Sequence, residues 1–243
     1  MSFSLFRAAV LVAATAIAGC AGQPSQSTKI PVIKADLEVA APQAGPYAAY
    51  GVPEYGKAIL VNIPSFELIA FEDGEPVLRS RVIIGKPRTP TPVMDTETSV
   101  VRFRPTWTPT PRMVREGYKP GTRPGGKGNP LGYLAIRLDP SMLIYLHGTN
   151  KPQLFERDKR ALSHGCVRVE KWDEVAAFVL DSDVEEVRRR AFGRRTHDRR
   201  TDGIPVIIGY HTEFPNADGV MQTWKDIYHR GSYAKRASDP SAG

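Results

Sequence analysis

Cysteine is scarce in this chain of 243 residues, which contains only Cys20 and Cys166. The paired spacings typical of zinc sites, Cys-x2-Cys and His-x3-His, are absent as well. Tetrahedral ligands could still come from residues far apart in the sequence, namely His147, His164, Cys166 and His211. A zinc site is therefore an alternative that the spacing does not favour, and we expect no metal and no cofactor.

The chain also lacks an apolar run of roughly 20 residues, the length that a membrane-spanning helix needs. Its most apolar stretch, residues 8–18, follows Arg7 and leads into Ile17-Ala18-Gly19-Cys20. A basic start, a short apolar stretch and small residues are typical of a secretory signal peptide, here residues 1–19. The last four residues resemble a bacterial lipobox, so we expect acylation of Cys20. An ordinary signal peptide cut nearby is the alternative.

Acidic residues are fewer than basic ones, and the formal charge of the whole chain is +7. Loss of residues 1–19 removes Arg7 and no acidic residue, which leaves +6. Export argues against a nucleic-acid partner, because the polyanions outside the inner membrane are lipid headgroups and the cell wall. Residues 188–200 hold seven arginines. We expect a solvated helix there, since glutamates precede arginines at the i, i+4 spacing, with contact to an acidic surface as the alternative.

Cys166 needs an explanation of its own once Cys20 is assigned to the lipid. Exported proteins usually place cysteines in disulfide pairs, and a single thiol is a candidate reactive group. A buried, inert cysteine is the alternative. We favour a functional thiol, because an idle one is open to oxidation outside the cytoplasm.

The composition divides the rest of the chain into a tether and one folded domain. Residues 20–56 are rich in proline, glutamine, alanine and glycine, which predicts an extended tether. Runs typical of β-strands follow, separated by turn residues, at 58–63, 66–72, 76–85, 98–104, 134–139, 143–148, 204–210 and 219–224. Helical periodicity is confined to about 170–180 and 183–192. We therefore expect one mostly β domain with flanking helices over 57–210, and a C-terminal strand and tail over 211–243.

Residues 105–132 interrupt this pattern. The stretch 105–111 is rich in proline, and 119–132 contains five glycines and three prolines with almost nothing apolar. A loop of this length inside a compact domain is uncommon unless it covers or builds a binding site. We predict a lid or short capping insertion.

His147 and Cys166 are the residues from which catalysis could be built. A thiol attacks carbonyl carbon as a thiolate, so a catalytic cysteine needs a base within hydrogen-bond reach. Histidine suits this role, and an imidazolium beside the sulfur stabilises the thiolate. Gly165 would allow an unusual backbone angle next to the nucleophile. The spacing alone leaves a structural role for both residues open.

The segments that flank these residues resemble the L,D-transpeptidase catalytic domain, the YkuD-type fold. The resemblance lies in YLHGT (145–149), a gap, and SHGCVR (163–168), with fifteen residues between His147 and Ser163. VIIGKPRTPTPV (82–93) and NPLGYLAIRL (129–138) are similar to further family segments in the same order. The resemblance implies a β-sandwich or barrel-like domain, covers roughly residues 57–182, and extends to the C-terminal part of longer Gram-negative members.

The resemblance also implies roles for individual residues. Cys166 matches the nucleophile, His147 matches its base, and Gly148 supplies the carbonyl that orients the imidazole. His164 matches the histidine that lines the acyl site, and Gly165 with Cys166 would offer N–H groups to the oxyanion.

Two more positions are implied to bind substrate, Ser163 and Arg168. A guanidinium at position 168 could hold a carboxylate of the donor peptide, although an internal ion pair is as compatible with the sequence. The implied partners are peptidoglycan stem peptides, the membrane through the N-terminal lipid, and a wall-attached outer-membrane protein as a further acceptor.

The implied reaction is acyl transfer through a thioester on Cys166. The acyl group is the third residue of a stem tetrapeptide, D-alanine leaves, and an amine acceptor takes the acyl group. Water as the acceptor would give a carboxypeptidase or hydrolase, and a non-catalytic lipoprotein tethering membrane to wall is a further alternative. Carbapenems are expected to acylate the thiol. Ala21 after Cys20 favours the periplasmic face of the outer membrane.

Overall fold

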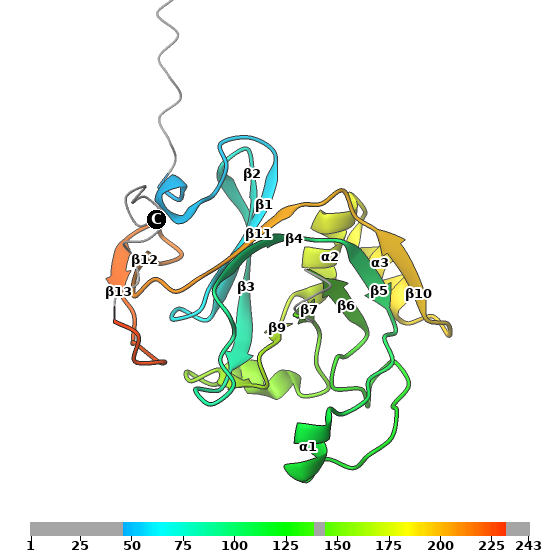
Figure 1. Ribbon diagram of the computed structural model, residues 1–243. Coiled ribbons are helices and arrows are strands. Elements are labelled where there is room, and N and C mark those ends of the chain that lie inside the picture. The colour runs from blue at the N-terminus through cyan, green and yellow to red at the C-terminus, as the bar shows by residue number, and fades with distance from the viewer. Residues whose placement is uncertain (1–45, 139–143, 232–243) are drawn as a thin grey trace, which may run out of the picture. The chain divides into compact units, whose positions relative to one another are not determined.

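The computed structural model describes residues 46–138 and 144–231 (Figure 1). Its first strands form the meander that the apolar runs predict: β1 (Lys57–Asn62), β2 (Glu67–Glu72) and β3 (Glu75–Gly85), paired in antiparallel fashion. The proposed signal peptide, Cys20 and residues 20–45 of the expected tether lie outside the described residues, as do 232–243.

The remaining elements follow the apolar runs closely, with several short strands that the sequence did not indicate. The strands are β4 (Met94–Glu97), β5 (Val100–Phe103), β6 (Leu134–Arg137), β7 (Tyr145–His147), β8 (Ala161–Ser163), β9 (Val167–Val169), β10 (His197–Arg200), β11 (Pro205–Gly209), β12 (Glu213–Pro215) and β13 (Met221–Thr223). The α-helices are α1 (Pro111–Arg115), α2 (Trp172–Leu180) and α3 (Val184–Ala191), and two 3-10 turns, η1 (Ala48–Tyr50) and η2 (Pro152–Glu156), complete the set.

Most of the strands belong to one sheet, in the order β10-β5-β6-β7-β9-β3-β2-β1-β11-β4, with β8 beside β3. The strand β4 lies at one end of this order and β5 is second from the other end, yet only residues 98–99 connect them. So short a connection brings the two ends together, and the sheet curls (Figure 1). The expected mostly β, barrel-like architecture is confirmed.

Strands β1 and β2 are buried on both faces. Ile59 and Val61 face the main core inside the curled sheet, whereas the alternate residues Ala58 and Leu60 pack in a second cluster. Alternation in a strand sends successive side chains to opposite faces, so a strand covered on both sides reads as a continuous apolar run. The second cluster also contains Tyr47, which is buried.

The position of Tyr47 corrects the expected end of the tether. Residues 46–56 pack on the domain, with the Arg79 guanidinium hydrogen-bonded to the Tyr47 hydroxyl and Val52 buried beside it. The folded part therefore begins before residue 57. It also continues past residue 210, because Phe214 lies in the same buried cluster.

The helices α2 and α3 cover one side of the main core (Figure 1). Val175, Ala176 and Val179 of α2 and Val187 of α3 are buried in it. The carboxylate of Asp183 accepts a hydrogen bond from the Glu186 N–H and caps the start of α3, as a short acidic side chain does at a helix N-terminus.

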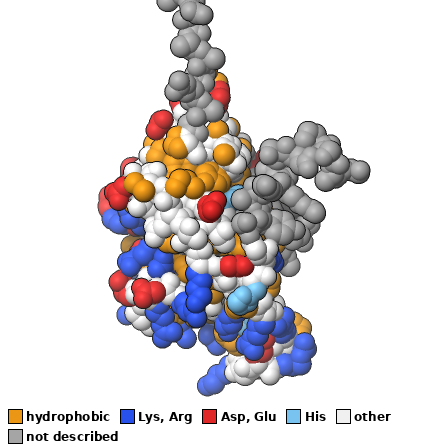
Figure 2. Space-filling view, turned by 90° about the vertical axis from the view of Figure 1, so that its left-hand side faces the viewer, with side chains coloured by type: hydrophobic (Ala, Val, Ile, Leu, Met, Phe, Trp, Pro, Cys, Tyr) orange, Lys and Arg blue, Asp and Glu red, His pale blue; other side chains and the backbone are white. Residues whose placement is uncertain are grey.

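The arginine-rich segment 188–200 is only partly helical, which corrects our expectation. Helix α3 ends at Ala191, and 197–200 form β10, paired antiparallel to β5. Arg188 pairs with Asp173 at 2.7 Å, and other acidic side chains neutralise further arginines. Figure 2 shows a different face of the domain, on which basic side chains also lie among acidic ones.

No helix within 46–138 and 144–231 is long and apolar enough to cross a bilayer. Helices α2 and α3 have nine and eight residues and contribute buried side chains to the core.

Candidate active site

The floor of the candidate site is built by β7 and β9, which run parallel as neighbours. The register pairs Leu146 with Val167 and His147 with Arg168. Leu146 and Val167 are fully buried in the core. Successive side chains of a strand point to opposite faces, so His147 and Cys166, which flank this buried pair, both point to the other face of the sheet. Because His147 pairs with Arg168, Cys166 lies diagonally next to His147. Residues nineteen apart in the sequence are thus neighbours in space.

A tight turn formed by residues 163–166 presents Cys166 at the start of β9. The Ser163 hydroxyl donates to the Cys166 carbonyl at 2.6 Å and accepts from the Gly165 N–H at 3.0 Å. Gly165 has φ +125°, a backbone angle that side-chain-bearing residues rarely adopt. Glycine at this position is therefore required by the turn.

Thr91 fastens this turn to the end of β3. Its buried hydroxyl donates to the Gly165 carbonyl at 2.7 Å and accepts from the Gly85 N–H at 2.9 Å. A Cβ on Gly85 would lie 2.1 Å from the Thr89 carbonyl oxygen, so only glycine allows the chain to fold back here. The Tyr228 hydroxyl donates to the Gly85 carbonyl at 2.7 Å and ties the C-terminal segment to the same point.

His147 is buried, and its ring is held by a main-chain carbonyl. Nδ1 donates to the Gly148 carbonyl oxygen at 2.6 Å, which leaves Nε2 as the basic nitrogen. Burial, and next the positive charge of Arg168, lower the pKa of His147 to about 3, although the carbonyls of Gly148 and Leu131 oppose this shift. The imidazole is therefore neutral at physiological pH. The expected role of Gly148 agrees with this contact.

The sulfur of Cys166 is half-buried in the same pocket. Burial raises the pKa of the Cys166 thiol, while the backbone of Tyr145 and the charge of Arg168 lower it by less. A neutral thiol thus faces a neutral imidazole in the resting protein. This differs from the thiolate–imidazolium pair that we expected, because desolvation disfavours both charges.

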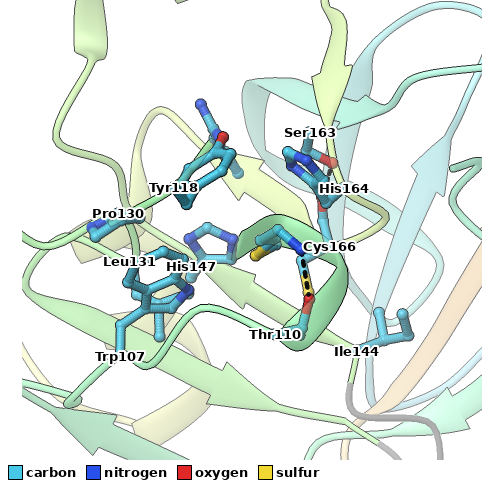
Figure 3. A pocket seen from close by; sticks show the side chains of 12 residues that line it. Trp107, Thr110, Tyr118, Pro130, Leu131, Ile144, His147, Ser163, His164 and Cys166 are labelled. Carbon is cyan, nitrogen blue, oxygen red and sulfur yellow. Dashed lines mark hydrogen bonds between the residues drawn. The ribbon is translucent and has the colours of Figure 1, made fainter. Parts of the chain in front are cut away.

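These side chains line a cavity of about 270 Å³. Figure 3 shows His147 and Cys166 side by side at its centre, with Trp107, Pro130 and Leu131 on one side and Ser163 and His164 on the other. The cavity thus has apolar and polar walls, as expected for a site that binds a peptide.

The segment 105–132 contributes Trp107, Met113 and Leu131 to the lining of this cavity. Its expected action as a lid stays a prediction. It contains α1, in which Thr110 caps the first turn and Pro111 takes the first helical position, where its missing N–H costs nothing. The helix lies apart from the curled sheet in Figure 1.

Glu116, at the end of α1, contacts the floor through His164. Its carboxylate lies 2.8 Å from His164 Nε2 and 3.1 Å from Arg112 Nε. The hydrogen bond with His164, followed by that with Arg112, lowers the pKa of Glu116 to about 2. The ring of Tyr118 meets the His164 imidazole edge-on at 5.5 Å. His164 thus lines the cavity, as expected, and also holds the lid.

Two expected roles change in this geometry. The Ser163 hydroxyl is used within the turn, so it shapes the site and has no evident part in binding substrate. The Gly165 N–H is used by the same hydroxyl and does not face an oxyanion. Arg168 lines the cavity, and its buried Nε makes no hydrogen bond within the described residues, which fits a role in binding.

The alternative zinc site is not assembled. His211 packs at 4.8 Å from the Tyr50 ring and does not line the cavity that holds Cys166. Within the part of the chain that the structure describes, no three histidine, cysteine or acidic side chains are grouped so as to hold a metal ion.

Comparison with known proteins decides the family. The family model described as the L,D-transpeptidase catalytic domain, YkuD, matches residues 56–208. The chain belongs to this family. The match includes the whole floor of the site and the lid, so the L,D-transpeptidase segments suggested by the sequence fall within it.

Relatives of this L,D-transpeptidase domain occur in Gram-negative bacteria. A Haemophilus influenzae protein assigned to the L,D-transpeptidases is 31% identical over 221 residues, which cover 73% of this chain and 45% of the relative. The Escherichia coli protein YcfS, assigned to the same class, is 37% identical over 132 residues, or 50% of this chain and 40% of YcfS. The chain thus spans less than half the length of these relatives.

Solved L,D-transpeptidase structures resemble the fold more distantly. LD transpeptidase LdtMt1 in complex with imipenem has a TM-score of 0.42 and 17% identity, covering 63% of this chain and 59% of that one. An L,D-transpeptidase from Mycobacterium smegmatis has a TM-score of 0.39 and 15% identity, covering 63% and 58%.

Sequence reasoning missed the residues that hold the L,D-transpeptidase site from outside its motif. Thr91 belongs to the segment VIIGKPRTPTPV that is similar to the family, whereas Glu116 and Tyr228 lie outside the segments that carry the resemblance. The available signal for Thr91 was its place between Pro90 and Pro92 in the segment 82–93. Nothing in the sequence pairs Glu116 with His164, or Tyr228 with Gly85, because these contacts depend on the folded path of the chain.

Proposed function

We propose that this protein is a peptidoglycan L,D-transpeptidase that acts through a thioester on Cys166. The observation that carries the proposal is the meeting of Cys166 and His147 on adjacent strands of one cavity, with the imidazole held by Gly148. Nucleophile, base and orienting group are the three parts that acyl transfer by a thiol requires. Membership of the family supports the same chemistry.

In the first half-reaction the Cys166 thiol gives its proton to His147 Nε2 as the sulfur attacks an amide carbonyl carbon. The amide joins the third residue of a stem peptide to D-alanine. His147 then protonates the amide nitrogen, the C–N bond breaks, D-alanine leaves, and a thioester remains. Because both groups are neutral at rest, proton transfer accompanies the attack.

We propose that Arg168 binds the carboxylate of the departing D-alanine. It pairs with His147 across the β7–β9 register, and its guanidinium reaches the same cavity. Its Nε makes no hydrogen bond within the described residues and is buried, so a carboxylate would supply a missing acceptor. This contact would place the scissile bond between sulfur and imidazole.

In the second half-reaction an amine attacks the thioester. His147 takes a proton from the amine, the C–S bond breaks, and Cys166 regains its proton. A second stem peptide would give a cross-link between third residues, and an amine of a wall-attached outer-membrane protein would give an anchored protein. Water in the same place would give a carboxypeptidase or hydrolase.

The test is to follow the thioester directly. The purified protein is mixed with a synthetic stem tetrapeptide and an acceptor amine, and both D-alanine release and the intact protein mass are recorded. We expect a mass increase equal to the acyl tripeptide on Cys166, and an adduct with a carbapenem at the same residue. Turnover without any Cys166 adduct, retained in Cys166→Ala, contradicts the mechanism.

Acceptor and hydrolase activities separate in the same assay. Tetrapeptide converted to tripeptide in the presence of amine indicates that water is the acceptor, whereas a joined product indicates transpeptidation. Muropeptide profiles of cells with and without the protein would show which product forms in the wall.

We further propose that the domain is held at the periplasmic face of the outer membrane by a lipid on Cys20. The lipobox-like Ile17-Ala18-Gly19-Cys20 supports this, and residues 21–45 would provide part of the reach to the wall. Labelling with palmitate tests it. The label should disappear in Cys20→Ala and persist in Cys166→Ala.

A further inference from the structure

A separate cavity of about 580 Å³ lies beside the glycine-rich residues 123–128, and neither member of the reacting pair lines it. Its lining combines three basic side chains, those of Arg104, Arg123 and Lys127, with the aromatic rings of Tyr133 and Phe192. No acidic residue is among the described lining. The cavity therefore presents positive charge and apolar surface together.

Arg104 is fixed in place by the segments around this cavity. Its Nη2 donates to the Gly125 carbonyl at 2.7 Å, and a Cβ on Gly126 would lie 3.2 Å from the same nitrogen, so the guanidinium rests on the glycines. The Arg104 N–H donates to the Tyr133 carbonyl at 2.7 Å, and the Arg104 carbonyl accepts from the Thr196 hydroxyl at 2.7 Å. The chain that follows α3 is thus held beside the cavity.

This chain adds an exposed aromatic ring and more positive charge. Phe192 is 57% exposed, and its ring meets the Tyr133 ring edge-on at 4.8 Å. Arg194 and Arg195 follow it, and both are exposed. With the three cations of the cavity, they make five basic side chains near one exposed apolar ring.

The arginine-rich segment 188–200 therefore has two parts with different surroundings. The three arginines of α3, Arg188, Arg189 and Arg190, each pair with an acidic side chain, as on an ordinary solvated helix. Arg194 and Arg195 form no ion pair within residues 46–138 and 144–231. Contact with an acidic surface, which the sequence left open as an alternative, thus fits the second part.

Basic side chains around an exposed apolar ring suit the surface of an anionic bilayer. Guanidinium and ammonium groups bind phosphate oxygens, and each cation near an anionic membrane adds to the attraction. A phenylalanine ring leaves water when it enters the boundary between head groups and acyl chains. A water-soluble acidic polymer offers the charges without this apolar layer, so the combination favours a lipid surface.

We propose that this basic face binds the surface of a bilayer that contains anionic phospholipids. The face consists of Arg104, Arg123, Lys127, Phe192, Arg194 and Arg195. The cations bind lipid phosphates, and the phenylalanine ring enters the head-group region. The folded domain makes this contact itself, so the contact requires neither the acyl group proposed on Cys20 nor the acyl-transfer reaction.

Sedimentation with vesicles tests the proposal. The protein is residues 20–243 with Cys20→Ala, which keeps every residue that the structure describes and removes the site of acylation. Vesicles contain phosphatidylcholine alone or an equal mixture with phosphatidylglycerol. We expect binding to the mixed vesicles to be about tenfold tighter or more at low salt, and most of this preference to disappear at high salt, because salt screens surface charge.

Two variants separate the charges from the ring. The triple variant Lys127→Gln, Arg194→Gln and Arg195→Gln changes only exposed residues and should lose most of the preference for the mixed vesicles. Phe192→Ser should bind about fivefold more weakly at either salt concentration, because the apolar ring is lost. Arg189→Gln is the matched control, since it removes an exposed, paired arginine of α3 and should bind like the parent protein.

Unchanged melting temperatures show that the variants are folded. Equal binding to both kinds of vesicle, or a preference that the triple variant retains, overturns the proposal. Binding to soluble polyglutamate but not to vesicles, lost in the triple variant, would assign the face to an acidic polymer and overturn it as well. None of these outcomes bears on the thioester on Cys166, which is tested separately.

Discussion

The floor and the roof of the active site are built in different ways. The floor, β7, β9 and the turn 163–166, is held by strand pairing and by hydrogen bonds that are buried, with Thr91 fully enclosed. The roof, residues 105–132, is held by hydrogen bonds within the segment, several of them from the Asn129 side chain. The Asn129 amide donates to the carbonyls of Pro105, Arg123 and Pro124 at 2.9, 3.3 and 3.0 Å. Glu116 connects roof to floor.

Because of this difference, the floor can hold the reacting groups in fixed positions while the roof can move to admit substrate. Strand ladders between buried residues open only with large parts of the fold, whereas a loop held by side-chain contacts opens locally at lower free energy. Reacting groups need fixed positions, and a substrate needs a way in. We therefore expect changes in the floor to act on kcat and changes in the roof to act on KM.

The largest effect is expected for the two reacting residues of the floor. Cys166→Ala should abolish thioester formation, and His147→Ala should lower kcat/KM by about a thousandfold or more, because base and nucleophile act as a unit. D-alanine release and intact mass measure both. The double variant should have the same residual kcat/KM as Cys166→Ala. If the losses from the two single substitutions added up in the double variant, the two residues would act independently.

Thr91 gives an intermediate effect within the floor. Thr91→Val keeps the shape but leaves the Gly85 N–H and the Gly165 carbonyl without their buried partner, at about 1–3 kcal/mol per unsatisfied group. We expect a lower melting temperature and a fall of about tenfold in kcat.

Thr91→Ser, which keeps the hydroxyl, is the control and should retain most of the activity. A wild-type kcat in Thr91→Val would show that the turn holds Cys166 in place without this contact.

A smaller effect is expected for the contact between roof and floor. Glu116→Gln removes the negative charge that is hydrogen-bonded to His164 and Arg112. We expect KM for the donor to rise by about two- to fivefold, with kcat nearly unchanged. Steady-state kinetics measure the split. Arg115→Gln, an exposed neighbour on α1, should match the wild type. A fall in kcat with unchanged KM would contradict the expectation that changes in the roof act on KM and changes in the floor act on kcat.

The smallest change is expected from pH, and it tests the burial of the floor. Because the pKa of His147 is lowered to about 3, the imidazole stays neutral and basic throughout mildly acidic pH. We expect kcat/KM to change by less than about twofold between pH 5 and 8. A histidine with an ordinary pKa near 6.5 would lose about thirtyfold at pH 5. A loss of that size would show that water reaches the ring.

Much of the fold could be predicted from local pattern. Continuous apolar runs predicted β1, β2 and β11, since strands buried on both faces need apolar residues at every position. The strand β10 was missed, because its arginines and aspartate look like a solvated helix until Asp198 meets Arg102 on β5. Tyr47 falls in the predicted tether for a similar reason, since a few tyrosines among prolines, alanines and glycines give no sustained apolar periodicity.

The sequence by itself determined the family, because the spacing of YLHGT and SHGCVR resembles one catalytic domain. It also predicted Cys166 and His147 as the reacting pair. Only the tertiary structure decided the protonation of the pair, the use of Ser163 within the turn, and the contacts of Thr91 and Glu116. A sequence motif shows which chemical groups the site contains. Desolvation and hydrogen bonding depend on residues brought together from distant parts of the chain, and these set the pKa and position of each group.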